Sequence, residues 1–174
     1  MDKPSLERVS NIAVILTCLA VMAQVGMGIY HRGTADTNPL PSRPVVYPTG
    51  AKISDTPGLE FTKAPKTLLL VTNSACHFCS ASMPFYKRLT ATAKANSTRV
   101  VAVTSEDTST NRNYLQSNGV EFDGVVSATE EGVLVRATPA LILVRRDGGV
   151  INSWVGQLSS EEEKAVLSNV KSTT

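Results

Sequence analysis

The sequence predicts an α/β domain with a central mixed β-sheet, and two patterns support this. Three short apolar runs are typical of buried strands: residues 67–72, 99–104 and 140–145. Stretches with helical character separate the first two runs and follow the second. A turn signal then joins the third run to one more apolar segment, which indicates a hairpin. The expected order is therefore β-α-β-α-β-β-α, with helices beside a mixed sheet.

The domain is expected to begin near Ala51, and its first half contains two strands and two helices. The run TLLLVT, residues 67–72, is the first strand, and a helix follows from about Cys79 to Lys94. The run RVVAVT is the second strand. The segment from Asn111 to Asn118 is predicted to be helical, because Gly119 suits the stop that follows a helix.

The second half contains the hairpin and the last helix. Asp147–Gly149 is the turn signal after the strand ALILVR, and residues 150–155 complete the hairpin. Ser160 with Glu163 three residues later predicts a capping box. It would begin a final helix that ends at about Lys171.

A long apolar segment precedes the domain. From Ile12 the chain reads IAVILTCLAVMAQVGMGIY, close to the roughly 20 apolar residues that a membrane-spanning helix needs. A cleaved signal peptide is the alternative, since residues 21–23 resemble a cleavage site. Apolar residues continue past Ala23, which favours an uncleaved anchor. Cys18 lies in this segment as a small apolar residue or, alternatively, a lipid attachment point.

The expected domain organisation has four parts: a tail at 1–10, a transmembrane anchor or signal peptide at 11–30, a proline-rich linker at 31–50, and the domain at 51–174. The linker is predicted to be extended. At about 3.1 Å per residue it could span roughly 60 Å. The short tail predicts that the domain lies on the exported side of a bacterial-type cytoplasmic membrane.

Composition excludes some functional classes. The chain has 174 residues, a formal net charge of +2 and 42% hydrophobic residues. A nucleic-acid-binding protein would carry a clustered basic face, and no run of like charges occurs. Three cysteines are too few for a disulfide scaffold. An isolated pair at CxxC spacing fits a redox site better.

The pair is Cys76 and Cys79, with His77 and Phe78 between them. Cys76 sits where a strand passes into a helix, and the unpaired N–H groups of a helix start lower the pKa of a cysteine there. His77, when protonated, would add to this effect. Cys76 is therefore expected to attack, and the more buried Cys79 to resolve the mixed disulfide.

Other uses of the pair remain alternatives. A structural zinc site needs four ligands, and the chain supplies no second cysteine pair. A purely structural disulfide would close a very small loop and stabilise little. Copper(I) could be held transiently by Cys76, His77 and Cys79, as in a metallochaperone or scaffold module.

With these motifs together, the sequence resembles thioredoxin-fold proteins, most closely the membrane-anchored, TlpA-like thiol:disulfide oxidoreductases. The resemblance covers about residues 65–170. It rests on the CxxC after a buried strand, Pro84 in the helix that follows, Thr138-Pro139 before the strand ALILV, and the closing segment DGGVINSWVGQLSSEEEKAVL.

The resemblance implies a thioredoxin-like fold and a redox-active Cys76–Cys79 disulfide, with no cofactor and no metal. It also implies a cis Pro139 that faces the cysteines, and backbone hydrogen bonds from Thr138 to an extended substrate. The alternative is that Pro139 merely begins a strand. Implied partners are exported protein thiols or disulfides and a transmembrane electron donor, with this chain acting as the reductant. An oxidant or isomerase is the alternative, because His77-Phe78 is not the common dipeptide and a histidine there favours the thiolate form and a more oxidising potential.

The sequence departs from the family pattern near the cysteines. Ala75 replaces a common tryptophan, and Leu70 stands where many relatives carry a polar or acidic residue that assists proton transfer. Glu106 and Asp107 follow the second strand, where some relatives place an acid near the site. Their more ordinary interpretation, favoured here, is a solvated loop with a helix cap.

Overall fold

The computed structural model describes residue 22 and residues 47–172 of the chain. Residues 47–172 form a sheet with helices around it. In chain order the elements are η1 (Phe61–Lys63), β1 (Lys66–Val71), α2 (His77–Ala81), α3 (Met83–Ala95), β2 (Thr98–Thr104), α4 (Thr108–Ser117), β3 (Gly124–Ser127), β4 (Ala140–Arg145), β5 (Val150–Val155) and α5 (Ser160–Lys171).

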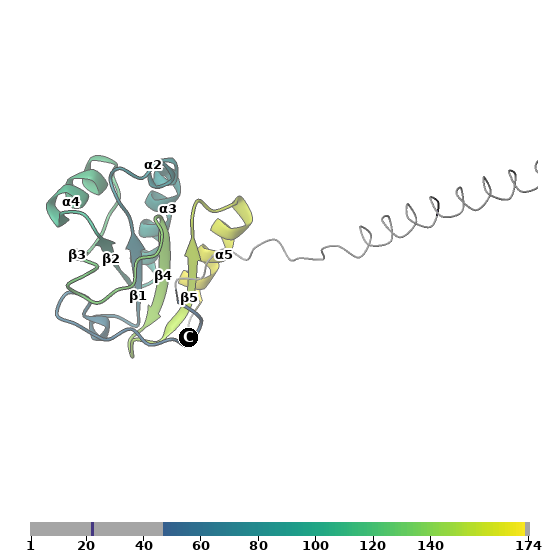
Figure 1. Ribbon diagram of the computed structural model, residues 1–174. Helices are drawn as coiled ribbons and strands as arrows, with labels where there is room; N and C mark the ends of the chain where they lie inside the picture. Colours follow the sequence, from purple (N-terminus) through teal and green to yellow (C-terminus); the bar gives the residue numbers. More distant parts are fainter. Residues whose placement is uncertain (1–21, 23–46, 173–174) are drawn as a thin grey trace, which may run out of the picture. The chain divides into compact units, whose positions relative to one another are not determined.

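The sheet has five strands in the order β3-β2-β1-β4-β5 (Figure 1). β1 pairs in parallel with β2, and β2 with β3. β4 runs antiparallel to both β1 and β5. The predicted mixed sheet is therefore confirmed, and β1 lies at its centre.

Two hydrophobic clusters form because alternate residues of each strand face opposite sides of the sheet. In β1, Leu68 and Leu70 join a cluster with residues of α3, α5 and Leu115 of α4. Leu69 and Val71 join the other cluster, which includes Phe61 of η1. With both faces covered, every residue of β1 is buried.

One strand was not predicted, and one helix is divided. β3 has only four residues, GVVS, all half-buried at the edge of the sheet, so its apolar signal is weak. The single helix expected from Cys79 to Lys94 is two helices that meet at Ser82. Pro84 explains the break, because proline lacks the N–H that would continue the helical bonding.

Two helix starts also differ from the predictions. α4 begins three residues earlier than expected, since the Asp107 side chain accepts a hydrogen bond from the Thr110 N–H. α5 ends at Lys171 as predicted, but its capping box uses Ser159 and Glu162. Two serines followed by three glutamates allow either register, so the sequence pattern alone was ambiguous.

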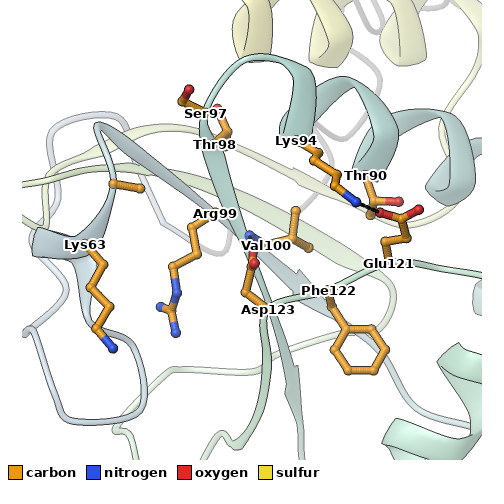
Figure 2. A pocket seen from close by; sticks show the side chains of 11 residues that line it. Lys63, Thr90, Lys94, Ser97, Thr98, Arg99, Val100, Glu121, Phe122 and Asp123 are labelled. Atoms are coloured by element: carbon orange, nitrogen blue, oxygen red, sulfur yellow. Dashed lines mark hydrogen bonds and ion pairs between the residues drawn. The ribbon is translucent and has the colours of Figure 1, made fainter.

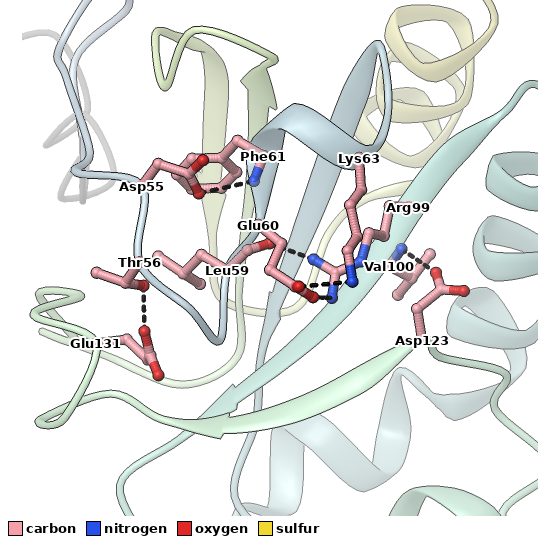
Figure 3. Close-up of polar contacts among 10 residues, drawn as sticks. All are labelled: Asp55, Thr56, Leu59, Glu60, Phe61, Lys63, Arg99, Val100, Asp123 and Glu131. Atoms are coloured by element: carbon pink, nitrogen blue, oxygen red, sulfur yellow. Dashed lines mark hydrogen bonds and ion pairs between the residues drawn. The ribbon is translucent and has the colours of Figure 1, made fainter.

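The segment before β1 is fastened by polar contacts to other parts of the domain (Figure 3). Arg99 of β2 pairs with Glu60 at 3.1 Å and donates to the carbonyl of Leu59. The Asp55 carboxylate accepts from the Phe61 N–H at 2.8 Å. These contacts hold Phe61 in the core beside the sheet.

Tyr47 attaches the start of the described segment to two distant positions. Its hydroxyl accepts a hydrogen bond from the Leu134 N–H at 2.7 Å. Its carbonyl accepts from the Ser153 hydroxyl of β5 at 2.8 Å. The predicted linker, residues 31–50, thus ends on the sheet edge and on the loop that leads to Thr138.

The anchor predicted for residues 11–30 lies outside the described residues, apart from Met22, which is helical. The remainder of the tail at 1–10 and of the linker up to residue 46 lies outside them too. In the part that the structure describes, no helix is both long enough and apolar enough to cross a membrane.

Candidate active site

The cysteine pair lies at the carboxyl end of β1, and strand register brings Thr138-Pro139 beside it. Val71, the last residue of β1, pairs with Ala140, the first residue of β4. Because the two strands are antiparallel, the residues just after β1 and just before β4 meet at one edge. The Cys76 thiol is 3.5 Å from the Thr138 carbonyl oxygen. The peptide bond between Thr138 and Pro139 is cis, as expected.

Cys76 occupies the N-cap position of α2, and its sulfur accepts a hydrogen bond from the Cys79 N–H at 3.2 Å. Partial burial opposes ionisation of this thiol. Hydrogen bonds involving Cys79, Thr138 and the Phe78 backbone outweigh that burial, so the pKa of Cys76 is lowered. A half-buried, readily ionised sulfur is suited to attack a disulfide.

Cys79 is one helical turn further on and is 0% exposed. Burial, followed by its hydrogen bond with Cys76, raises the pKa of Cys79 to about 12. Both cysteines are free thiols here. Because their environments differ, the pKa of Cys76 is lowered and the pKa of Cys79 is raised.

His77 and Phe78 are exposed between the cysteines. Phe78 is 55% exposed, one of few large apolar side chains that the described residues leave in solvent. The His77 ring meets the Phe78 ring edge-on, with centroids 5.7 Å apart. The influence of His77 on the pKa of Cys76 stays a prediction.

Glu106 and Asp107 have different roles, and the solvated-loop interpretation is wrong for Glu106. Asp107 is the expected helix cap, at the start of α4. Glu106 is partly buried and accepts hydrogen bonds from the Ser74 N–H, the Ser74 hydroxyl and Asn111. Although burial opposes it, these bonds lower the pKa of Glu106.

Sequence reasoning missed this link between Glu106 and the turn before Cys76. A signal for it was available. β1 and β2 are parallel neighbours, so the residues that follow them meet at the same edge of the sheet. Leu70, where an acid was expected from the family pattern, is instead fully buried in a hydrophobic cluster.

Two tyrosines also lie near the cysteines. Tyr86 of α3 is buried, and that burial raises its pKa, with the cysteines contributing in the same direction. Tyr114 of α4 shares a 2.9 Å hydrogen bond with the Ser80 hydroxyl of α2. Burial raises the pKa of Tyr114 too, so both phenols stay protonated near neutral pH and are weak proton donors.

No group of three or more histidine, cysteine or acidic side chains within residues 47–172 is arranged to hold a metal ion. Trp154 and Phe85 pack against the cluster that contains Leu68 and Leu70, as core-type aromatic residues.

Two cavities of the described domain lie away from the cysteines. One of about 390 Å³ is lined by side chains at the amino end of β2, including Lys63, Arg99 and Asp123 (Figure 2). Its lysine and arginine side chains pair with neighbouring carboxylates, as Lys94 does with Glu121. Cys76 lies beyond the opposite end of β1 and is partly exposed.

No family model matches the sequence, and no curated protein matches it. Solved structures do. The Chlorobium tepidum protein that carries the name thiol:disulfide interchange protein DsbE is 24% identical with a TM-score of 0.57, and the match covers 72% of this chain and 99% of the other. The thioredoxin domain of a Bacteroides vulgatus thiol-disulfide oxidoreductase is 13% identical, with a TM-score of 0.56 and coverages of 72% and 99%.

The chain has the thioredoxin fold. A thiol-disulfide isomerase from Corynebacterium glutamicum agrees with this, at 18% identity, a TM-score of 0.52 and coverages of 78% and 100%. The fold expected from the sequence resemblance is therefore confirmed. At such low identities a thioredoxin fold does not by itself establish an activity, which has to be argued from the site.

Proposed function

We propose that the chain is a thiol:disulfide oxidoreductase that exchanges disulfides with other proteins through Cys76 and Cys79. The supporting observation is the asymmetry of the pair. Cys76 is half-buried with a lowered pKa, whereas Cys79 is fully buried with a pKa raised to about 12. Cys76 is suited to attack a substrate disulfide, and Cys79 is suited to attack the mixed disulfide in the second step. Disulfide exchange requires these two roles.

The reduced chain transfers two electrons to a substrate disulfide in two steps. The Cys76 thiolate attacks one substrate sulfur, the substrate S–S bond breaks, and the other substrate sulfur leaves as a thiolate that takes up a proton. Cys79 then gives its proton to the surrounding water and attacks the Cys76 sulfur, which releases the first substrate sulfur as a thiolate that takes up a proton. The chain is left with a Cys76–Cys79 disulfide, and the substrate is a dithiol.

Thr138 and Pro139 form the other side of the substrate site. In the reduced chain the Thr138 carbonyl accepts from the Cys76 thiol. Once Cys76 is a thiolate it has no proton to donate, and the Thr138 backbone is available to pair with an extended substrate segment.

The proposal also includes the direction of electron transfer and the location of the chain. The chain acts as a reductant of exported proteins, held at the membrane by residues 11–30 and spaced from it by residues 31–50. Resemblance to TlpA-like proteins and the apolar segment from Ile12 support this part. A reductant on the exported side must be re-reduced, and a transmembrane thiol relay is the class of donor that supplies two electrons and two protons there.

Substitution of the two cysteines tests the exchange mechanism. Cys76→Ser is expected to abolish reduction of a disulfide-bonded peptide by the full-length chain. Cys79→Ser is expected to retain the first attack and to accumulate a mixed disulfide through Cys76, visible as a mass increase that dithiothreitol removes. Full exchange activity in Cys76→Ser would refute the proposal.

The reduction potential of the pair tests the direction. The full-length chain is equilibrated in glutathione or dithiothreitol buffers, and the oxidised fraction is measured by alkylation. A potential near about −270 mV agrees with a reductant, whereas one near about −120 mV would make the chain a disulfide donor.

A further inference from the structure

The turn between β1 and Cys76 is held in place by one carboxylate. The Ser74 N–H donates to Oε1 of Glu106 at 2.8 Å, and the Ser74 hydroxyl donates to Oε2 at 2.6 Å. Glu106 follows β2, so this pair of bonds joins the ends of two neighbouring strands. Charge-assisted bonds of this kind are about twice as strong as those between neutral groups.

Glu106 is itself fixed from the other side. Asn111 of α4, which is fully buried, donates to Oε1 of Glu106 at 2.8 Å. The amide oxygen of Asn111 accepts from the Thr72 hydroxyl at 3.2 Å. The Glu106 N–H donates to the Thr104 hydroxyl at 3.2 Å. The carboxylate is thus fixed by Asn111 of α4 on one side and bonded to Ser74 on the other, which leaves Ser74 little freedom.

The residue next to Ser74 contacts Cys76 directly. The Asn73 carbonyl accepts from the Cys76 N–H at 3.1 Å. A shift of the turn would therefore move Cys76 relative to Cys79.

We propose that Glu106 is a positioning residue for disulfide exchange: it holds Ser74, and through Ser74 the Asn73 backbone, so that Cys79 can attack the mixed disulfide on Cys76. This inference rests on the proposed function. Glu106 touches neither sulfur, and it acts through the geometry of the turn. Its contribution is thus expected to depend on the shape of its side chain more than on its charge.

Two conservative variants separate shape from charge. Glu106→Gln removes the charge but keeps every bond: its carbonyl oxygen accepts from Ser74 N–H and Asn111, and its NH₂ donates to the Ser74 hydroxyl. Glu106→Asp keeps the charge but withdraws the carboxylate by about 1.5 Å, one carbon–carbon bond. Glu106→Ala removes both shape and charge. Asp107→Asn is the matched control, since it removes a neighbouring charge while asparagine still caps α4.

The measurement is the rate at which Cys79 resolves a preformed mixed disulfide between Cys76 and a chromophoric thiol, in the full-length chain. The resolution rate of Glu106→Gln is expected to stay within about threefold of the wild-type rate. Glu106→Asp and Glu106→Ala are expected to be slower by about tenfold or more, because a displacement near 1 Å costs up to about 100-fold in such reactions. Amide exchange at Ser74 is expected to accelerate in the same two variants and to stay slow in Asp107→Asn.

Two outcomes would overturn the inference. Rates within about twofold of wild type in all Glu106 variants would show that the contact has no effect on exchange. A slow Glu106→Gln beside a fast Glu106→Asp would assign the effect to charge or proton transfer. If Glu106→Ala does not fold, the comparison of Glu106→Gln with Glu106→Asp still tests whether the shape or the charge of the side chain matters. Failure of the proposed function is distinguishable, because it would appear as activity in Cys76→Ser.

Discussion

Cys76 and Cys79 are the same chemical group in two environments only one helical turn apart. The first caps α2 and accepts from an N–H donor, whereas the second is 0% exposed. Ionisation is therefore favoured at Cys76 and opposed at Cys79. In the proposed exchange, this difference makes Cys76 the attacking sulfur.

The pH dependence of alkylation measures this difference directly. The pKa of Cys76 is lowered, so its labelling by iodoacetamide is expected to persist below the usual cysteine range and to decline as pH falls through the folded-state pKa. Cys79, with a pKa raised to about 12, is expected to stay unlabelled in the folded chain near neutral pH. Mass spectrometry of digested samples taken between pH 4 and pH 10, roughly the accessible range, locates the label.

His77→Ala is the companion variant for this profile. If protonated His77 stabilises the thiolate, its removal moves the Cys76 inflection to higher pH and slows labelling below it. Labelling of Cys79 before Cys76, or an inflection at the ordinary cysteine value in wild type, would contradict the assignment of roles.

At the scale of elements, the break between α2 and α3 produces a short helix devoted to the cysteines. Pro84 has no N–H to give to the Ser80 carbonyl, so regular bonding ends there. The Ser82 hydroxyl donates to the Phe78 carbonyl at 2.8 Å, and the same carbonyl accepts from the Ser82 N–H at 3.2 Å. As a result α2 has five residues, and Cys79 points into the domain from its first turn.

The opposite end of the sheet is stabilised by a buried lysine. Lys66 begins β1, is only 6% exposed, and donates to the carbonyls of Asn169, Val170 and Ser172 at the end of α5. The last carbonyls of a helix have no partners within it, so these bonds satisfy them. The cation also complements the negative end of the helix dipole. Lys66 thereby attaches α5 to the central strand.

Lys66→Met is expected to lower the free energy of unfolding by about 1–3 kcal/mol, because several carbonyls lose a charged donor. Lys171→Met is the control, an exposed lysine on α5 whose loss is expected to change stability by less than about 0.5 kcal/mol. Urea unfolding of both variants, followed by circular dichroism, gives the comparison. Equal stability of the two variants would show that the Lys66 contacts contribute nothing.

At the scale of the whole molecule, the proposed function requires the cysteines to face exported substrates. In that proposal the apolar segment from Ile12 and the proline-rich linker serve as the tether. Tyr47, near the end of the predicted linker, is bonded both to β5 and to Leu134, in the loop that leads to Thr138.

Expression of the full-length chain in a bacterium tests the tether. The protein is expected to stay with membranes after an alkaline carbonate wash and to be labelled at Cys76 by a maleimide that cannot cross the membrane. Leu16→Arg combined with Ala20→Arg is expected to release it, since each arginine at the centre of a span costs about 2.5–3.5 kcal/mol. Shortening of the mature chain near Ala23 would show a cleaved signal peptide, and labelling only after permeabilisation would place the domain inside.

Much of the fold could be predicted because its elements are specified by residues close together in the chain. The strands β1, β2, β4 and β5 were visible as apolar runs, and β4 and β5 have the predicted bounds. β3 was missed because four half-buried residues at a sheet edge carry little periodicity. The capping box of α5 was displaced by one residue because the sequence SSEEE allows two registers.

The sequence by itself predicted the fold and pointed to the type of chemistry that we propose. CxxC after a buried strand, with a distant Thr-Pro before another, favours disulfide exchange. Only the tertiary structure decided how the two sulfurs differ and what holds them. The opposite pKa shifts come from burial and hydrogen bonds, and Glu106 reaches Ser74 because β1 and β2 are parallel neighbours. Such contacts join residues far apart in the chain, so local sequence patterns do not reveal them.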